Sequence, residues 1–98
     1  MANKGKLAGF KMLDIRVSGR VQGVGFRACA QDRALELGLR GWVRNSDEDV
    51  ELSIAGFADE VDRMVAWCRM GPPLARVDEV LVSTRSLEME ERDFRITW

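Results

Sequence analysis

The chain contains 98 residues with a formal net charge of -1; 46% of the residues are hydrophobic and 32% are charged. This length supports one compact domain, and the composition is that of an ordinary folded globule, which excludes a disordered or membrane-spanning chain. A net charge this close to zero gives no global attraction to nucleic acid, so any attraction for an anion has to be local.

Residues 1–10 contain no apolar stretch long enough for a signal peptide or a membrane-spanning helix. We therefore expect a flexible tail over residues 1–10, a single domain over residues 11–98, and a cytoplasmic location. Cys29 and Cys68 fit no CxxC or metal-ligand pattern, and the chain has no histidine, so no metal site is expected. Both thiols are expected to be reduced on buried helix faces, although a disulfide stays open if the two helices pack side by side.

The N-terminal half predicts a strand, a loop and a helix. Apolar and polar residues alternate from Met12 to Ser18, the period of a strand with one buried face. After a glycine-interrupted loop, apolar residues recur at helical spacing from Phe26 to Leu37, and Gly38 is expected to end this helix. Such a loop is often only a tight connection. It also has the layout of an anion cradle, because a helix N-terminus exposes unpaired N–H groups and Arg27 adds a fork of donors that suits phosphate.

The C-terminal half predicts three further strands and a second helix. Their expected positions are a strand over 39–46, a polar hairpin turn over 47–49, a strand over 50–54, a helix from about Ala58 to the Gly71-Pro72-Pro73 stop, a strand over 77–83, and a short edge strand or extension over 94–98. The order βαββαβ predicts an α+β, ferredoxin-like (split βαβ) sandwich with two helices on one face of an antiparallel sheet. Many small binding domains share this order, so it does not define a function.

Two segments carry a specific resemblance to a known family. Residues 17–27 (VSGRVQGVGFR) resemble the first signature of the acylphosphatases, and residues 41–45 (GWVRN) resemble the second. The similarity continues through residues 37–39 and 71–77 and covers nearly the whole chain from about Met12. The resemblance implies the ferredoxin-like fold and an acylphosphatase that hydrolyses small acyl phosphates to a carboxylate and inorganic phosphate.

The resemblance also implies roles for individual residues. Arg27 is expected to bind the substrate phosphate and Asn45 to position the attacking water. The loop residues expected to share in substrate binding are Arg20, Val21, Gln22, Gly23 and Val24, with Gln22 structuring the loop rather than acting in catalysis. No metal or other cofactor is expected, because the carboxylate leaving group is weakly basic and needs little help from an acid.

The segment after Asn45 departs from the family pattern. The family usually continues through a few polar residues to a glycine, one further residue and a valine, whereas this chain reads Ser46-Asp47-Glu48-Asp49-Val50 and appears one residue shorter. Hairpin length sets strand register, so a shortened turn could displace Asn45. We expect the benign alternative, a different tight turn carried by Asp47 or Asp49 that leaves Asn45 in place.

Other charged and aromatic residues are expected to be structural. Arg16, Arg20, Arg40 and Arg44 either raise the potential around the loop or form solvated surface, and residues 47–49 are expected to be a solvated turn. Trp42, Trp67 and Trp98 are expected to pack in the core or at an edge.

Several other functions fit the same fold. One is a noncatalytic anion-binding or interaction module that keeps the cradle without turnover. Another is a domain of a larger hydrogenase-maturation carbamoyltransferase, although no zinc-finger cysteines follow in this sequence. A third is an RNA-binding domain, which the net charge and the missing aromatic signature disfavour. The leading expectation is a monomer that acts on a small acyl phosphate, with no nucleic-acid or membrane partner.

Overall fold

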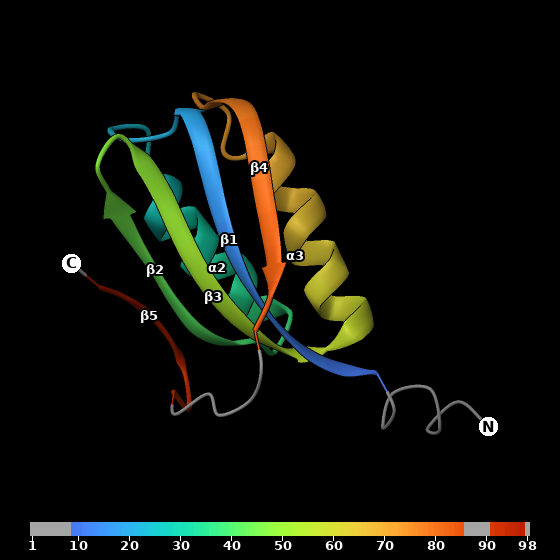
Figure 1. Cartoon of the computed structure of the whole chain (residues 1–98). Coiled ribbons are helices and arrows are strands. Elements are labelled where there is room, and N and C mark those ends of the chain that lie inside the picture. The colour runs from blue at the N-terminus through green and yellow to red at the C-terminus, as the bar shows by residue number, and fades with distance from the viewer. Residues whose placement is uncertain (1–8, 86–90, 98) are drawn as a thin grey trace.

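The computed structural model of the protein describes residues 9–85 and 91–97. Within these residues, two helices pack on one sheet of five strands. In chain order the elements are β1 (Phe10–Arg20), α2 (Phe26–Glu36), β2 (Arg40–Ser46), β3 (Asp49–Phe57), α3 (Ala58–Met70), β4 (Arg76–Thr84) and β5 (Phe94–Ile96). The strands lie side by side in the order β4-β1-β3-β2-β5, which confirms the predicted ferredoxin-like arrangement (Figure 1).

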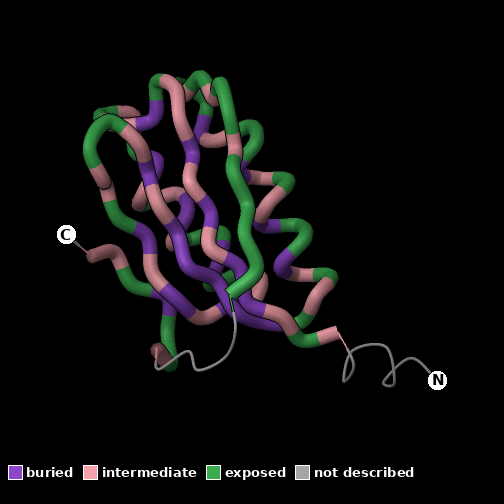
Figure 2. The backbone as a smooth tube through the Cα atoms, in the orientation of Figure 1, coloured by how far each residue is buried: buried purple, intermediate pink, exposed green. Residues whose placement is uncertain are grey.

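In the described part of the chain, both helices cover the same face of the sheet and neither covers the other face, which we call the open face (Figure 1). The alternation that predicted β1 decides which residues face the helices, because Leu13, Ile15 and Val17 are all buried in the core. In the antiparallel pairing of β1 with β3, Val17 lies opposite Val50, which is also fully buried. Figure 2 shows buried residues concentrated along β1 and β3, whereas the edge strand β4 is mostly exposed. The core therefore lies between the central strands and the two helices.

The helix boundaries agree closely with the sequence. α2 begins at Phe26 as predicted, and Gly38 just after it has φ +70°, the left-handed stop that the sequence indicates. α3 ends at Met70, directly before the predicted stop at Gly71. β1 is longer than its alternation suggests: it begins at Phe10, the last residue assigned to the tail, whereas residues 1–8 lie outside the described part of the chain.

The C-terminal edge strand forms, but the sheet is not wholly antiparallel. β5 pairs in parallel with β2, with Phe94 opposite Gly41 and Ile96 opposite Val43. The reason is topological, since β4 runs antiparallel to β1 and hence to β2, so a strand that returns from the end of β4 runs in the direction of β2. The prediction of an antiparallel sheet is confirmed for β1 to β4, and β5 adds a parallel edge strand whose direction the sequence did not indicate. Trp98 lies outside the described residues.

The structure shows how far both cysteines are buried and what Trp42 and Trp67 contact. Both cysteines are free; Cys68 on α3 is fully buried, and this burial raises the pKa of its thiol to about 12, whereas Cys29 is only half-buried. Trp67 packs edge-on against Phe26, with ring centroids 5.2 Å apart, and Trp42 lies beneath the Arg44 guanidinium at 4.9 Å. Across the described ranges, the helices are too short or too polar to cross a membrane.

Gly41 is required by the close approach of β2 to β3. Its φ is +139°, and a Cβ atom there would lie 1.8 Å from the carbonyl oxygen of Ser53. We expect Gly41→Ala to lower the free energy of unfolding by about 3 kcal/mol or more, because strained backbone and steric overlap add. Gly38→Ala is the matched control, because Gly38 also has positive φ but a Cβ atom there would meet nothing within 4 Å. It should cost only about 1 kcal/mol. Equal losses in urea unfolding would contradict the assigned close approach.

Candidate active site

Residues of both sequence signatures meet in one pocket. This pocket has a volume of about 320 Å³ and lies where the loop after β1, the start of α2, the end of β2 and β5 come together. Its lining residues are Val21, Gln22, Gly23, Gly25, Phe26, Arg27, Ala28, Asn45 and Ile96. The structure therefore brings together Arg27, Asn45 and three of the predicted loop residues.

The start of α2 gives this pocket a positive end. The helix is capped by Gly25, whose carbonyl oxygen accepts the N–H of Cys29 at 3.1 Å and closes the first turn. The N–H groups that precede Cys29 in the helix have no acceptor within it, and no acidic residue lies in the first turn to offset their partial positive charge. Arg27 is half-buried and its Nη1 is buried. An anion in the pocket would face helix N–H groups and a guanidinium together.

The position of Asn45 follows from the pairing of β2 with β3. Asn45 lies opposite Val50, and Ser46 lies opposite Asp49, so only Asp47 and Glu48 form the turn. Asp47 takes φ +57°, which supplies the positive φ that glycine usually provides in such turns. Asn45 lies two residues after the buried Val43 in β2, so both side chains are on the same, helix-covered face of the sheet. The prediction of a tight turn carried by Asp47 or Asp49 is confirmed, with Asp47 in that role.

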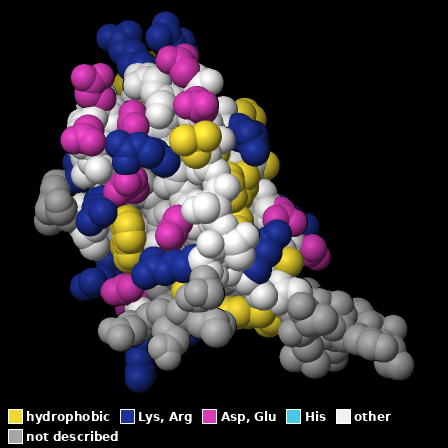
Figure 3. Space-filling model, in the orientation of Figure 1, with side chains coloured by type: hydrophobic (Ala, Val, Ile, Leu, Met, Phe, Trp, Pro, Cys, Tyr) yellow, Lys and Arg dark blue, Asp and Glu magenta, His cyan; other side chains and the backbone are white. Residues whose placement is uncertain are grey.

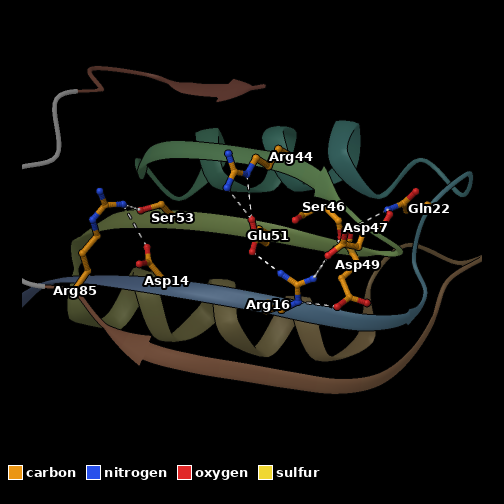
Figure 4. Close-up of polar contacts among 10 residues, drawn as sticks. All are labelled: Asp14, Arg16, Gln22, Arg44, Ser46, Asp47, Asp49, Glu51, Ser53 and Arg85. Carbon is orange, nitrogen blue, oxygen red and sulfur yellow. Dashed lines mark hydrogen bonds and ion pairs between the residues drawn. The ribbon is translucent and has the colours of Figure 1, made fainter. Parts of the chain in front are cut away.

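Gln22 joins the loop to this turn. Its Nε2 donates hydrogen bonds to the carbonyl oxygens of Asp47, at 2.8 Å, and Asp49, at 2.9 Å (Figure 4). The loop and the hairpin are thus tied to each other at the pocket. The structure supports the structural role that the sequence indicates for Gln22.

Arg16 contacts the same turn from the opposite face of the sheet. Its Nε lies 2.7 Å from Asp49 Oδ2, its Nη1 pairs with Glu51, and its Nη2 lies 3.4 Å from the carbonyl oxygen of Ser46 (Figure 4). The hydrogen bond to Asp49 and the negative charges around it raise the pKa of the Arg16 guanidinium, against a smaller opposing effect of burial. The expectation of a wholly solvated turn is therefore wrong for Asp49, because residues distant in sequence pair there.

The open face of the sheet carries interspersed charges of both signs (Figure 3). A hollow of about 490 Å³ lies on this face, and several of its charged side chains pair with one another, such as Arg16 with Glu51 and Arg85 with Asp14. Arg16 and Arg44 lie on this face and not around the loop. They therefore do not line the pocket that residues of both signatures form.

Two predicted loop residues lie away from the pocket. Arg20 is the exposed last residue of β1, is paired across the strands with Arg76, and lines a separate hollow with Asp78. Val24 packs against the hydrophobic core. Ile96 was missed as a lining residue, because its alternation with Phe94 predicts a strand but does not indicate that the strand lies beside Asn45.

Comparison with known proteins shows the family to which this chain belongs. The Acylphosphatase family model matches residues 13–96. The chain belongs to the acylphosphatase family. It is 49% identical to an acylphosphatase of Methylococcus capsulatus over 87 residues, which is 88% of this chain and 95% of that protein. It is also similar to the structure of an acylphosphatase from Coxiella burnetii, with a TM-score of 0.87, 38% identity and coverage of 94% of this chain and 97% of the other.

A larger protein contains a region of the same fold. The chain matches the crystal structure of full-length HypF in its phosphate- and nucleotide-bound form with a TM-score of 0.84 and 27% identity. This match covers 91% of the acylphosphatase chain but only 12% of the HypF chain. The acylphosphatase fold thus also occurs as a small part of a longer protein.

The contribution of the two Gln22 hydrogen bonds to the stability of the hairpin can be tested. Gln22→Met keeps the length of the side chain and removes both donated bonds, so we expect the free energy of unfolding to fall by about 1–2 kcal/mol. Amide hydrogen exchange should become faster in hairpin residues 45–50. Gln31→Met is the control, since Gln31 Nε2 donates to the carbonyl of Phe94 at 3.0 Å and does not contact the turn. Unchanged exchange in the hairpin of the Gln22 variant would show that the turn does not depend on these bonds.

Proposed function

We propose that this chain hydrolyses small acyl phosphates, with Arg27 and the loop over residues 20–24 holding the phosphate and Asn45 positioning the attacking water. The observation that carries the proposal is the pocket of about 320 Å³ that both Arg27 and Asn45 line together with the loop. Each residue belongs to one of the two signatures, and membership of the acylphosphatase family supports the reaction class.

The phosphate is bound by groups that are already in place. Gly23 lines the pocket and lets the loop backbone come close to a tetrahedral anion. The N-terminus of α2 and the Arg27 guanidinium supply the positive charge. Backbone N–H groups of the loop complete the proposed set; the side chain of Arg20, which lines another hollow, contributes no contact to it.

The chemical step transfers the phosphoryl group to water. The water oxygen forms a bond to phosphorus while the bond from phosphorus to the acyl oxygen breaks, and the carboxylate leaves with the electron pair. The Asn45 side chain can hold the water by hydrogen bonds, but an amide is too weak a base to accept its proton. A phosphate oxygen of the substrate accepts that proton. Because charge spreads over the phosphoryl oxygens in a loose transition state, positioning and fixed donors account for most of the catalysis.

The acyl group is expected to contact Ile96. In the parallel pairing of β5 with β2, Ile96 lies opposite Val43 and so next to Asn45 on the same face. Ile96 is half-buried against the core and lines the pocket. This apolar wall, in a pocket of about 320 Å³, suits a small acyl phosphate.

We also infer a single-domain enzyme over residues 11–98 that acts as a monomer in the cytoplasm and does not bind nucleic acid. The match of the family model to residues 13–96 supports one domain. The net charge of -1 supports a small anionic substrate over a polyanion, because the positive groups are concentrated locally.

Substitution of the two central residues tests the proposed function. We expect Arg27→Ala and Asn45→Ala each to lower kcat/KM for acetyl phosphate at least roughly a hundredfold in buffer with a metal chelator, because each removes a fixed group at the reacting phosphate. Arg27→Ala should also weaken binding of inorganic phosphate, whereas Asn45→Ala should leave it nearly unchanged.

Arg33→Ala is the matched control for Arg27, because Arg33 lies on the exposed side of the same helix and pairs with Glu36. Its activity should equal that of the unaltered chain. Phosphate binding without any hydrolysis by the unaltered chain would favour the noncatalytic module instead.

The proposed contact between Ile96 and the acyl group can be tested separately. Ile96→Ala should lower kcat/KM for benzoyl phosphate about threefold to tenfold more than for acetyl phosphate, because it removes apolar contact with the larger acyl group. Val80→Ala is the control, since Val80 is also a half-buried strand residue packed against the core, but it does not line the pocket. If Ile96→Ala changes both substrates equally, the acyl group does not contact this wall.

A further inference from the structure

We propose that Arg16 is a positioning residue of the active site. It holds the turn of Asp47 and Glu48, with the flanking Ser46 and Asp49, from the open face of the sheet and thereby keeps Asn45 in the pocket. This inference rests on the proposed role of Asn45. Arg16 lies on the opposite face of the sheet from the pocket and does not line it. Its effect on the reaction therefore has to pass through the turn.

The contacts of Arg16 span both strands of the hairpin. On β3 it pairs with Glu51, its direct cross-strand neighbour, and with Asp49 at 2.7 Å. At the end of β2 its Nη2 lies 3.4 Å from the carbonyl oxygen of Ser46 and 3.4 Å from Asp47 Oδ2. Ser46 is the residue directly after Asn45. The planar guanidinium fork makes these contacts with three nitrogens, which a lysine ammonium cannot reproduce.

The turn is held from two sides. Gln22 binds the carbonyl oxygens of Asp47 and Asp49 from the loop, whereas Arg16 binds the side chains of the same two residues from the open face (Figure 4). Such bracing matters in a turn that has no glycine and takes positive φ at Asp47. A small displacement of a water-positioning group is costly in rate, so any shift of Asn45 in a turn held on one side only should slow the reaction.

The pairs of Arg16 with Asp49 and Glu51 are also better shielded than an ordinary surface pair, whereas the Asp47 side chain is 88% exposed. The side chains of Arg16, Asp49 and Glu51 are 32%, 22% and 23% exposed, compared with 45% and 67% for the helix pair of Arg33 and Glu36. Glu51 is further held by Arg44 at 3.0 Å. Networks of partly shielded charges hold their geometry more firmly than isolated exposed pairs. The cluster is therefore suited to fix the turn.

The test is a double-mutant cycle on kcat. Arg16→Met keeps the stem of the side chain and removes the fork, and we expect it to lower kcat for acetyl phosphate roughly tenfold while binding of inorganic phosphate stays within about twofold. In the Asn45→Ala background, Arg16→Met should cause almost no further loss, because its effect is transmitted through Asn45. Arg16→Lys should recover only part of the lost rate.

Arg85→Met is the matched control. Arg85 is an arginine of the same open face that binds Ser53 Oγ at 2.7 Å and lies 3.4 Å from Asp14, and none of these contacts reaches the turn. It should leave kcat unchanged. A purely structural role of Arg16 would lower kcat by the same factor with and without Asn45, or would be matched by Arg85→Met, and either result would overturn the inference.

A second measurement keeps the inference testable without activity. In nuclear magnetic resonance spectra, Arg16→Met should shift the side-chain amide signals of Asn45, and Arg85→Met should leave them in place. If the unaltered chain shows no hydrolysis, the proposed function fails, and these signals still decide whether Arg16 positions Asn45. Unchanged Asn45 signals in the Arg16 variant would refute the positioning role.

Discussion

The candidate active site depends on the contact between the loop after β1 and the turn between β2 and β3. Gln22 makes this contact by donating to the carbonyl oxygens of Asp47 and Asp49. The antiparallel pairing of β1 with β3 makes it possible, because Val17 lies opposite Val50 and brings the end of β1 to the start of β3. Without this register, the loop that precedes Arg27 and the strand that carries Asn45 would not meet in one pocket.

The two faces of the sheet contribute to this site in different ways. The helix-covered face provides the pocket, in which the N-terminus of α2 and Arg27 concentrate positive charge although the whole chain is nearly neutral. The open face provides a set of ion pairs centred on Arg16 that contact the same turn. An acyl phosphate already has a good leaving group, so binding and orientation are the main tasks left to so small a fold.

Local patterns predicted the parts of the fold that local physics decides. The start of α2 at Phe26, its stop at Gly38 and the tight turn at Asp47 all follow from residues close in sequence. The parallel pairing of β5 did not follow, because it depends on the direction of β4 across the whole sheet. Neither did the pairing of Arg16 with Asp49, since charge patterns do not show which distant side chains meet.

The resemblance to acylphosphatases supplied the proposed roles of Arg27 and Asn45, which neither composition nor periodicity could have given. The structure adds that both line one pocket with Ile96. In the proposed reaction, water held in this pocket attacks phosphorus. Hydrolysis of acetyl phosphate in water labelled with the heavy oxygen isotope tests it most directly. We expect the label in the inorganic phosphate, where attack at phosphorus places it, whereas label in the acetate would mean attack at the carbonyl carbon and would contradict the proposed reaction.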